Sequence, residues 1–172
     1  MPAHAPAQAP AHVDLADVLR VSILGNSGIG IKILPEALRD EHSEARTMHV
    51  LMRLAAACSE VRGFPSVFFD VSEVHKLPAQ FSNGVVELID RGLSGSGEVF
   101  FSGINEGAQI EAQLQQWELL QLVFIDRDST TFIPASAEDR EKFGRMLQAL
   151  QALHIADELG ASGDSQLPRR PS

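Results

Sequence analysis

Residues 72–80 hold the side chains best placed to do chemistry in this sequence. His75 and Lys76 are adjacent, and they follow a run, 66–71, with the β-branched and aromatic character of a buried strand. An imidazole and an ammonium group at such a place can bind an anion or move a proton. Ligands and partners of α/β folds meet the loops at the carboxyl ends of strands, so this segment is the predicted partner or ligand loop. Its candidate contact residues are Glu73, His75, Lys76, Pro78, Ala79 and Gln80.

Nucleophilic catalysis is not expected. Cys58, the only cysteine, follows three alanines on the apolar side of a predicted helix, so it is predicted to be a small buried hydrophobe. A single cysteine also excludes an internal disulfide and any zinc site built on several thiolates. No set of Ser, His and Asp stands in a recognisable catalytic context. We expect no enzyme and no catalytic residue, and keep as a lesser alternative a small α/β hydrolase or transferase that uses His75 with Cys58 or a serine.

Metal and nucleotide sites are not expected either. His42 and His49 are seven residues apart beside Glu41 and Glu44, but a first-row metal usually needs three or four ligands in a fixed shell. The glycine-rich segment 25–30 matches a phosphate-binding loop only loosely, and it joins two predicted strands, so a hairpin turn is the better interpretation. The sequence therefore predicts no metal and no cofactor.

The charge balance narrows the class of partner. Fourteen Lys and Arg against 23 Asp and Glu give a formal net charge of −9, which disfavours nucleic acid as a partner. The two tails hold only Asp164, Arg169 and Arg170 as formally charged side chains, a net charge of +1, so the acidity belongs to the folded part and favours protein recognition. No apolar run approaches the ~20 residues of a membrane-spanning helix, and the first residues do not resemble a secretory signal. We expect no membrane insertion and a cytoplasmic location.

The positioning elements are predicted within a single domain, residues 14–158, between a Pro/Ala-rich flexible arm, 1–13, and a flexible tail, 159–172. A hairpin is predicted from strands 18–24 and 29–33. Further strands are expected at 66–71, 98–103 and 119–125. Helices are expected at 36–61 with a break at 40–43, from Pro78 to Gly92, at 106–118 with Asn105 as cap, and from Ser136, whose capping-box partner is Asp139. This order predicts an α/β fold: a mixed, mostly parallel sheet of four to five strands packed with four helices.

The loop and its preceding strand resemble the STAS family, the domain shared by anti-sigma-factor antagonists and the cytoplasmic tails of sulphate transporters. The best-matching run is Val67-Phe68-Phe69-Asp70-Val71-Ser72-Glu73-Val74. Segments 97–105, 119–133 and 136–139 look like later family elements, and the likeness covers residues 15–153 by element order more than by identity. The resemblance implies a small STAS-like fold and a non-enzymatic regulatory module whose protein partner is an anti-sigma factor, a related kinase or a transporter component.

The sequence departs from the family at its phosphorylated switch. Without a gap, Pro78 and Ala79 stand where the family has Asp and the phosphorylated Ser or Thr, so the switch residue would be absent. A three-residue insertion would instead place Ser82-Asn83-Gly84 over Ser-Ser-Gly and make Ser82 the phosphate acceptor. The ungapped alignment is favoured because Pro78 suits a first helical turn.

Two functions remain open on this fold. The leading hypothesis is a regulatory module that binds a protein partner through the loop and the second helix. The alternative is a sensor or transporter-associated subunit that binds an anion or nucleotide at the loop, with Lys76 as a contact. A homodimer is kept as a further arrangement of the chain.

Overall fold

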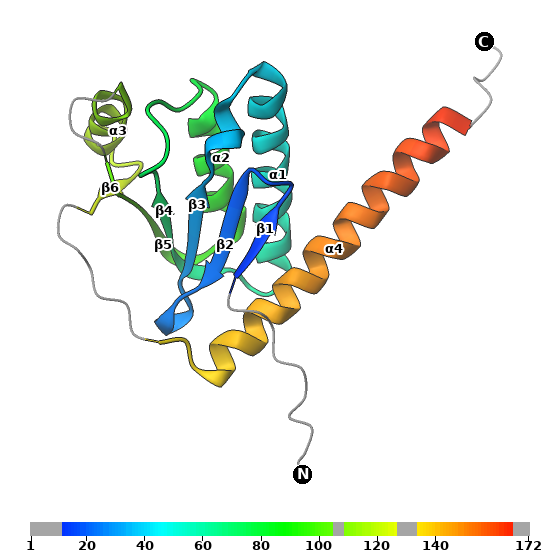
Figure 1. Cartoon of the computed structure of the whole chain (residues 1–172). Helices are drawn as coiled ribbons and strands as arrows, with labels where there is room; N and C mark the ends of the chain where they lie inside the picture. The colour runs from blue at the N-terminus through cyan, green and yellow to red at the C-terminus, as the bar shows by residue number, and fades with distance from the viewer. Residues whose placement is uncertain (1–11, 105–108, 127–133, 167–172) are drawn as a thin grey trace.

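The computed structural model describes residues 12–104, 109–126 and 134–166. The strands within these ranges form one six-stranded sheet in chain order (Figure 1). They are β1 (His12–Leu15), β2 (Leu19–Ile23), β3 (Ile29–Ile33), β4 (Phe64–Asp70), β5 (Leu93–Ser102) and β6 (Phe124–Ile125). The α-helices of the described part are α1 (Glu41–Glu60), α2 (Phe81–Glu87), α3 (Gln109–Leu119) and α4 (Ala137–Gln166). Shorter turns are η1 (Gly25–Ser27), η2 (Pro35–Leu38) and the π-helical η3 (Leu88–Gly92).

The sheet is mixed and mostly parallel, which confirms the predicted α/β class. β1, β2 and β3 pair antiparallel, whereas β3, β4, β5 and β6 pair parallel. The described ranges hold six strands rather than the four or five expected. The additional strand is β1, in which Val13 pairs with Val21 and Leu15 with Leu19. Four residues beside a Pro/Ala-rich arm are too few to show an alternating pattern in the sequence.

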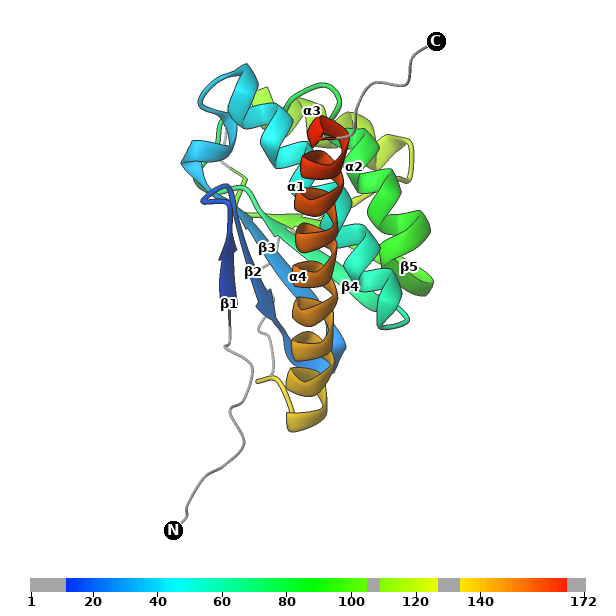
Figure 2. The ribbon, with the colours of Figure 1, turned by 90° about the vertical axis from the view of Figure 1, so that its right-hand side faces the viewer.

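One face of the sheet carries the core. Ile31, Phe69 and Phe101 lie side by side on β3, β4 and β5, and all three are fully or almost fully buried. α1 packs against α2, η3 and α4, and Figure 2 shows α1 and α2 together on one side of the strands. On the opposite face Phe68 and Phe100 stack with ring centroids 4.8 Å apart and are only half-buried. Helices of the described part therefore cover mainly one face of the sheet.

Local sequence signals place two of the predicted features correctly. β2 and β3 form the expected hairpin, and Asn26 at its turn adopts a φ of 62°, which asparagine tolerates. α1 begins after Asp40, whose Oδ1 accepts a hydrogen bond from the backbone N–H of Ser43 at 2.8 Å. This cap lowers the pKa of the Asp40 carboxyl. The predicted break is present but lies at Arg39 and Asp40, at the start of the expected range 40–43, because residues 41–43 already belong to α1. η2 precedes the break with Pro35 in its first turn.

The last helix also starts as predicted. Ser136 donates its backbone N–H to Asp139 Oδ2 at 2.9 Å, and Asp139 donates its backbone N–H to Ser136 Oγ at 3.1 Å. This reciprocal pair is a capping box. Phe143 and Met146 follow on the buried side of α4. The helix runs to Gln166, beyond residue 158, where we expected the folded domain to end, and Figure 1 shows its later turns projecting away from the sheet.

Three predicted boundaries are wrong. α2 begins at Phe81, not at Pro78, and β5 begins at Leu93, five residues early. The strand expected at 119–125 is reduced to β6, because α3 continues to Leu119 and the chain then turns at Gln121 with a φ of 58°. An apolar run by itself does not distinguish a helix end from a strand. Asn105, the expected cap of α3, lies outside the described residues.

Candidate functional site

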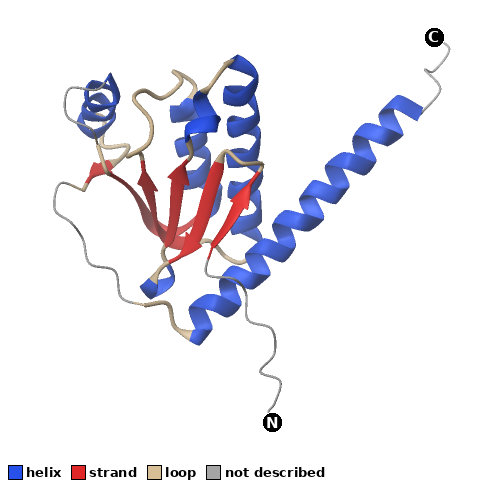
Figure 3. Ribbon diagram, viewed as in Figure 1, coloured by secondary structure: helices blue, strands red, loops and turns tan. Residues whose placement is uncertain are grey.

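The candidate site is the loop that leaves β4 at the carboxyl edge of the parallel strands, visible at the upper edge of the sheet in Figure 3. The first turn of this loop is fixed by the end of β4. Asp70 Oδ1 accepts a hydrogen bond from the backbone N–H of Ser72 at 2.9 Å. Val71 donates its N–H to the carbonyl of Ser102 on β5 at 3.0 Å. Asp70 therefore shapes the first turn of the loop.

Gly103 completes this corner. It has a φ of 74°, a conformation that favours glycine, and a Cβ at this position would lie 2.8 Å from Asp70 Oδ1. The end of β5 can therefore approach the loop closely only because residue 103 has no side chain.

The second half of the loop is held by α3. Gln113 Oε1 accepts the N–H of Leu77 at 2.9 Å, and Gln113 Nε2 donates to the carbonyl of Leu77 at 2.7 Å. The N–H of Ile110 donates to the carbonyl of His75 at 2.9 Å. Both ends of the loop are thus tied to neighbouring elements. Gln113 was missed at the sequence level, because nothing in a helical glutamine indicates which backbone it will meet.

Burial divides the loop residues into two sets. The inward set packs into the core and comprises Val74, Leu77 and Pro78, all buried. The outward set is exposed and comprises Glu73, His75, Lys76, Ala79 and Gln80. Of the six predicted contact residues, Pro78 alone is turned inward, so its role is to support the loop. These five exposed side chains are the predicted recognition surface, and the loop that carries them is hydrogen-bonded to neighbouring elements at both ends.

A pocket of about 480 Å³ opens at this edge. It is lined by Pro35, Leu38, Glu73, Val74, His75, Lys76 and Gln109. Three of the predicted residues thus share one pocket, whereas Pro78, Ala79 and Gln80 lie outside its lining. Glu73 forms an ion pair with Lys32 of β3, Oε1 to Nζ 3.5 Å. The pocket offers an imidazole and an ammonium group beside a carboxylate that is already paired, a set able to bind an anion.

Ser82 lies in the first turn of α2. Its hydroxyl donates to the carbonyl of Ala79 at 3.3 Å, and the residue is half-buried. Two residues later, Gly84 packs against α1, and a Cβ there would collide with the side chain of Leu51. Because the helix begins three residues later than the sequence predicted, Ser82 occupies the place in its first turn that Ala79 was expected to hold.

The remaining candidates do not join this site. Cys58 is fully buried near the end of α1, and burial raises the pKa of its thiol to about 12. α1 starts at the carboxyl edge of the sheet and ends at its amino edge, so Cys58 and the His75 loop lie at opposite edges. The structure therefore does not bring the two together as a nucleophile and a base.

The histidines of α1 stand apart as well. His42 and His49 are both exposed. Within residues 12–104, 109–126 and 134–166, no three His, Cys, Asp or Glu side chains are grouped closely enough to hold a metal ion.

None of the helices in the described part combines the length and the apolar character needed to cross a membrane.

The comparisons with known proteins leave the family open. The STAS resemblance rests on the match around Asp70 and on the order of elements. Comparison of the chain with protein-family models, with curated proteins and with solved structures finds no match.

Proposed function

We propose that the chain is a non-enzymatic, STAS-like regulatory module that binds a protein partner through the loop after β4 and the start of α2. The observation that carries this proposal is the fixed presentation of the outward loop residues. Loop N–H groups donate to Asp70 Oδ1 and to the Ser102 carbonyl on one side, and Gln113 pairs with the Leu77 backbone on the other, so the loop is held from two sides. A surface held in this way binds a partner at a lower entropic cost than a mobile loop. The acidic chain suits a partner with a basic face.

Binding of the partner is tested with a charge reversal in the loop. Wild-type protein, Lys76→Glu and the control Arg91→Glu are used to enrich proteins from native extract, and the dissociation constant of the recovered partner is then measured by calorimetry. Arg91 is an exposed cation on η3, outside the loop. We expect Lys76→Glu to weaken binding about tenfold, with Arg91→Glu unchanged. Equal affinity for all three proteins would place the interface elsewhere.

We infer that Ser82 is the phosphate acceptor of this module. The start of α2 at Phe81 and the close packing of Gly84 support the alignment with a three-residue insertion, which places Ser82-Asn83-Gly84 over the family's Ser-Ser-Gly. A phosphate here would add negative charge beside the recognition surface and change partner affinity. Mass spectrometry of protein purified from its own cells should find one phosphate on Ser82, absent in Ser82→Ala. An unmodified Ser82 in a chain that still binds its partner would identify a constitutive binder.

The second candidate function is anion or nucleotide sensing, and the 480 Å³ pocket beside His75 and Lys76 supports it. A ligand present at 100 times its dissociation constant should stabilise the fold by ~2.7 kcal/mol. Thermal denaturation with sulphate and with a series of nucleotides measures this effect, and Lys76→Ala should abolish it. Melting temperatures that do not change with any of these ligands would remove this candidate.

A further inference from the structure

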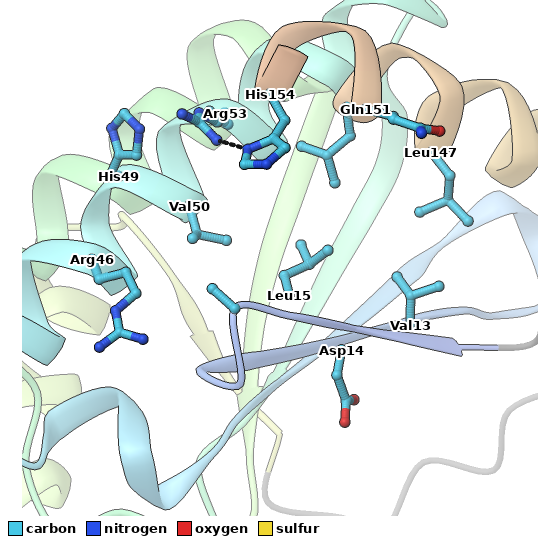
Figure 4. Close-up of a pocket in the computed structure, with 12 residues that line it drawn as sticks. Val13, Asp14, Leu15, Arg46, His49, Val50, Arg53, Leu147, Gln151 and His154 are labelled. Carbon is cyan, nitrogen blue, oxygen red and sulfur yellow. Dashed lines mark hydrogen bonds between the residues drawn. The ribbon is translucent and has the colours of Figure 1, made fainter. Parts of the chain in front are cut away.

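A second pocket, larger than the loop pocket, lies beside the outer strand β1, between β1, α1 and α4 (Figure 4). β6 is the outer strand on the other side of the sheet. The volume of this second pocket is about 660 Å³, within the range of about 300–1,000 Å³ that is usual for small-molecule sites. The apolar lining residues are Val13, Leu15, Ala16, Val50, Leu147 and Leu150. The pocket shares no lining residue with the loop pocket. Its floor and walls therefore suit an apolar group.

The polar groups of this pocket are mainly cationic or neutral. Arg46, His49 and Arg53 come from α1, and His154 comes from α4. Arg53 Nη1 and His154 Nδ1 are 2.8 Å apart, and this hydrogen bond joins the two helices at one side of the pocket. Arg46 is exposed and has no ion-pair partner among the residues that the structure describes. Although the chain has a net charge of −9, the two arginines in the lining give this pocket a local excess of positive charge.

The carboxylate in the lining does not neutralise that excess. Asp14 points away from the pocket, and its Oδ1 accepts a hydrogen bond from Arg20 Nε at 2.7 Å (Figure 4). This pairing lowers the pKa of the Asp14 carboxyl, so the group stays ionised on the other side of β1. The charge that a ligand meets inside the pocket is therefore that of the arginines.

Arg46 lies at one end of the pocket, whereas Arg53 with its partner His154 lies above the middle, between the two ends. Figure 4 shows Arg46 at one end and Val13 with Leu147 at the other, with Leu15 and Val50 between them. We propose that this pocket binds an amphipathic anion: an unbranched acyl chain that ends in a carboxylate. The carboxylate pairs with Arg46, and the chain lies along Leu15, Val50 and Leu150. This inference does not depend on the proposed function.

The probe is decanoate, with 1-decanol as its uncharged counterpart, titrated into the full chain by calorimetry. Decanoate should bind at a single site. Dodecanoate should bind roughly tenfold tighter, because each buried methylene adds to the apolar contact. Removal of the charge should weaken binding, so 1-decanol should bind about tenfold less tightly than decanoate. No binding of either acid would overturn the proposal.

Variants locate the site. Arg46→Glu should weaken decanoate binding about tenfold, whereas the control Arg145→Glu, an exposed arginine of α4 outside the lining, should not. Val50→Lys and Leu150→Lys place an ammonium group in the chain path from two different helices, and each should abolish binding. Melting temperatures identify a lysine variant that fails to fold. The lysine variant that still folds then tests whether the chain path is where decanoate binds. Decanoate binding that is unchanged in Arg46→Glu and in the folded lysine variants would overturn the assignment.

Discussion

The Cys58 thiol is a buried group whose protonation contributes to stability. Burial raises its pKa from the ordinary 9.0 to about 12. Between these values the folded chain keeps a proton that the unfolded chain releases, so this contribution is fully present below pH 9 and is lost as the pH rises towards 12.

We expect the free energy of unfolding of the wild-type protein to fall more steeply across this window than that of Cys58→Ala. The difference should be of the order of 1 kcal/mol per pH unit, measured by urea denaturation. The partly buried Lys142 has a lowered pKa and acts in the opposite direction, but it is present in both proteins. Parallel curves for the two proteins would show that the thiol does not differ between the folded and unfolded states.

Gly84 is a position where the absence of a side chain decides packing. A Cβ there would collide with Leu51 and lie 3.1 Å from Met48 Cε, so Gly84→Ala must push α2 away from α1. We expect a loss of about 1–3 kcal/mol in the free energy of unfolding, measured by urea denaturation. The neighbouring Asn83 is exposed, and Asn83→Ala should change stability by less than about 0.5 kcal/mol.

A double variant tests whether the collision with Leu51 causes the loss of stability in Gly84→Ala. Leu51→Ala removes the atoms that the new methyl group would meet. The double variant, which carries both Gly84→Ala and Leu51→Ala, should therefore lose less free energy of unfolding than the two single variants lose in sum. Strict additivity would show that the cost of Gly84→Ala does not come from Leu51.

At the scale of elements, the hydrogen bonds of Gln113 on α3 clamp the second half of the loop that carries the predicted recognition surface. Gln113→Ala leaves the N–H and the carbonyl of Leu77 without this partner, and we expect a loss of about 1–2 kcal/mol in stability. The local effect should be larger: hydrogen exchange of the Leu77 amide should speed up while that of Phe69 in β4 stays slow. Mass spectrometry of exchanged peptides measures both.

Two further variants make this test specific. Gln113→Glu keeps an acceptor for the N–H of Leu77 but loses the donor to its carbonyl, so its exchange rate should lie between those of wild type and Gln113→Ala. Gln116 is exposed on the same helix, and Gln116→Ala should leave exchange unchanged. Slow exchange at Leu77 in Gln113→Ala would mean that the loop is held by its buried residues alone.

At the scale of the whole molecule, features that depend on contacts close in the sequence could be predicted, whereas features that depend on contacts far apart in the sequence could not. The hairpin and the capping box of α4 depend on residues within a few positions of each other, and both were predicted. The break before α1 was predicted as well, but Asp40 was not predicted as the cap of that helix. The start of α2, the strand β1 and the clamp by Gln113 depend on partners far along the chain, and they were missed. Of the candidate site, the loop and its exposed residues could be predicted, but the inward turn of Pro78 could not.

The last prediction concerns the contribution of α4 to the whole fold. Phe143 and Met146 are fully buried in the core, whereas Figure 1 shows the turns towards Gln166 projecting away from the sheet and from α1. Removal of a large core side chain costs about 2–5 kcal/mol, so a chain without residues 137–172 loses an amount comparable to the whole stability of a domain.

We therefore expect the chain that ends at 136 to be unfolded, and the chain that ends at 154 to melt within a few degrees of the full chain. Circular dichroism during heating measures both. The shorter deletion keeps His154 and its hydrogen bond to Arg53, so it should also keep decanoate binding. A large loss of stability in the chain that ends at 154 would show that residues 155–172 pack on the domain.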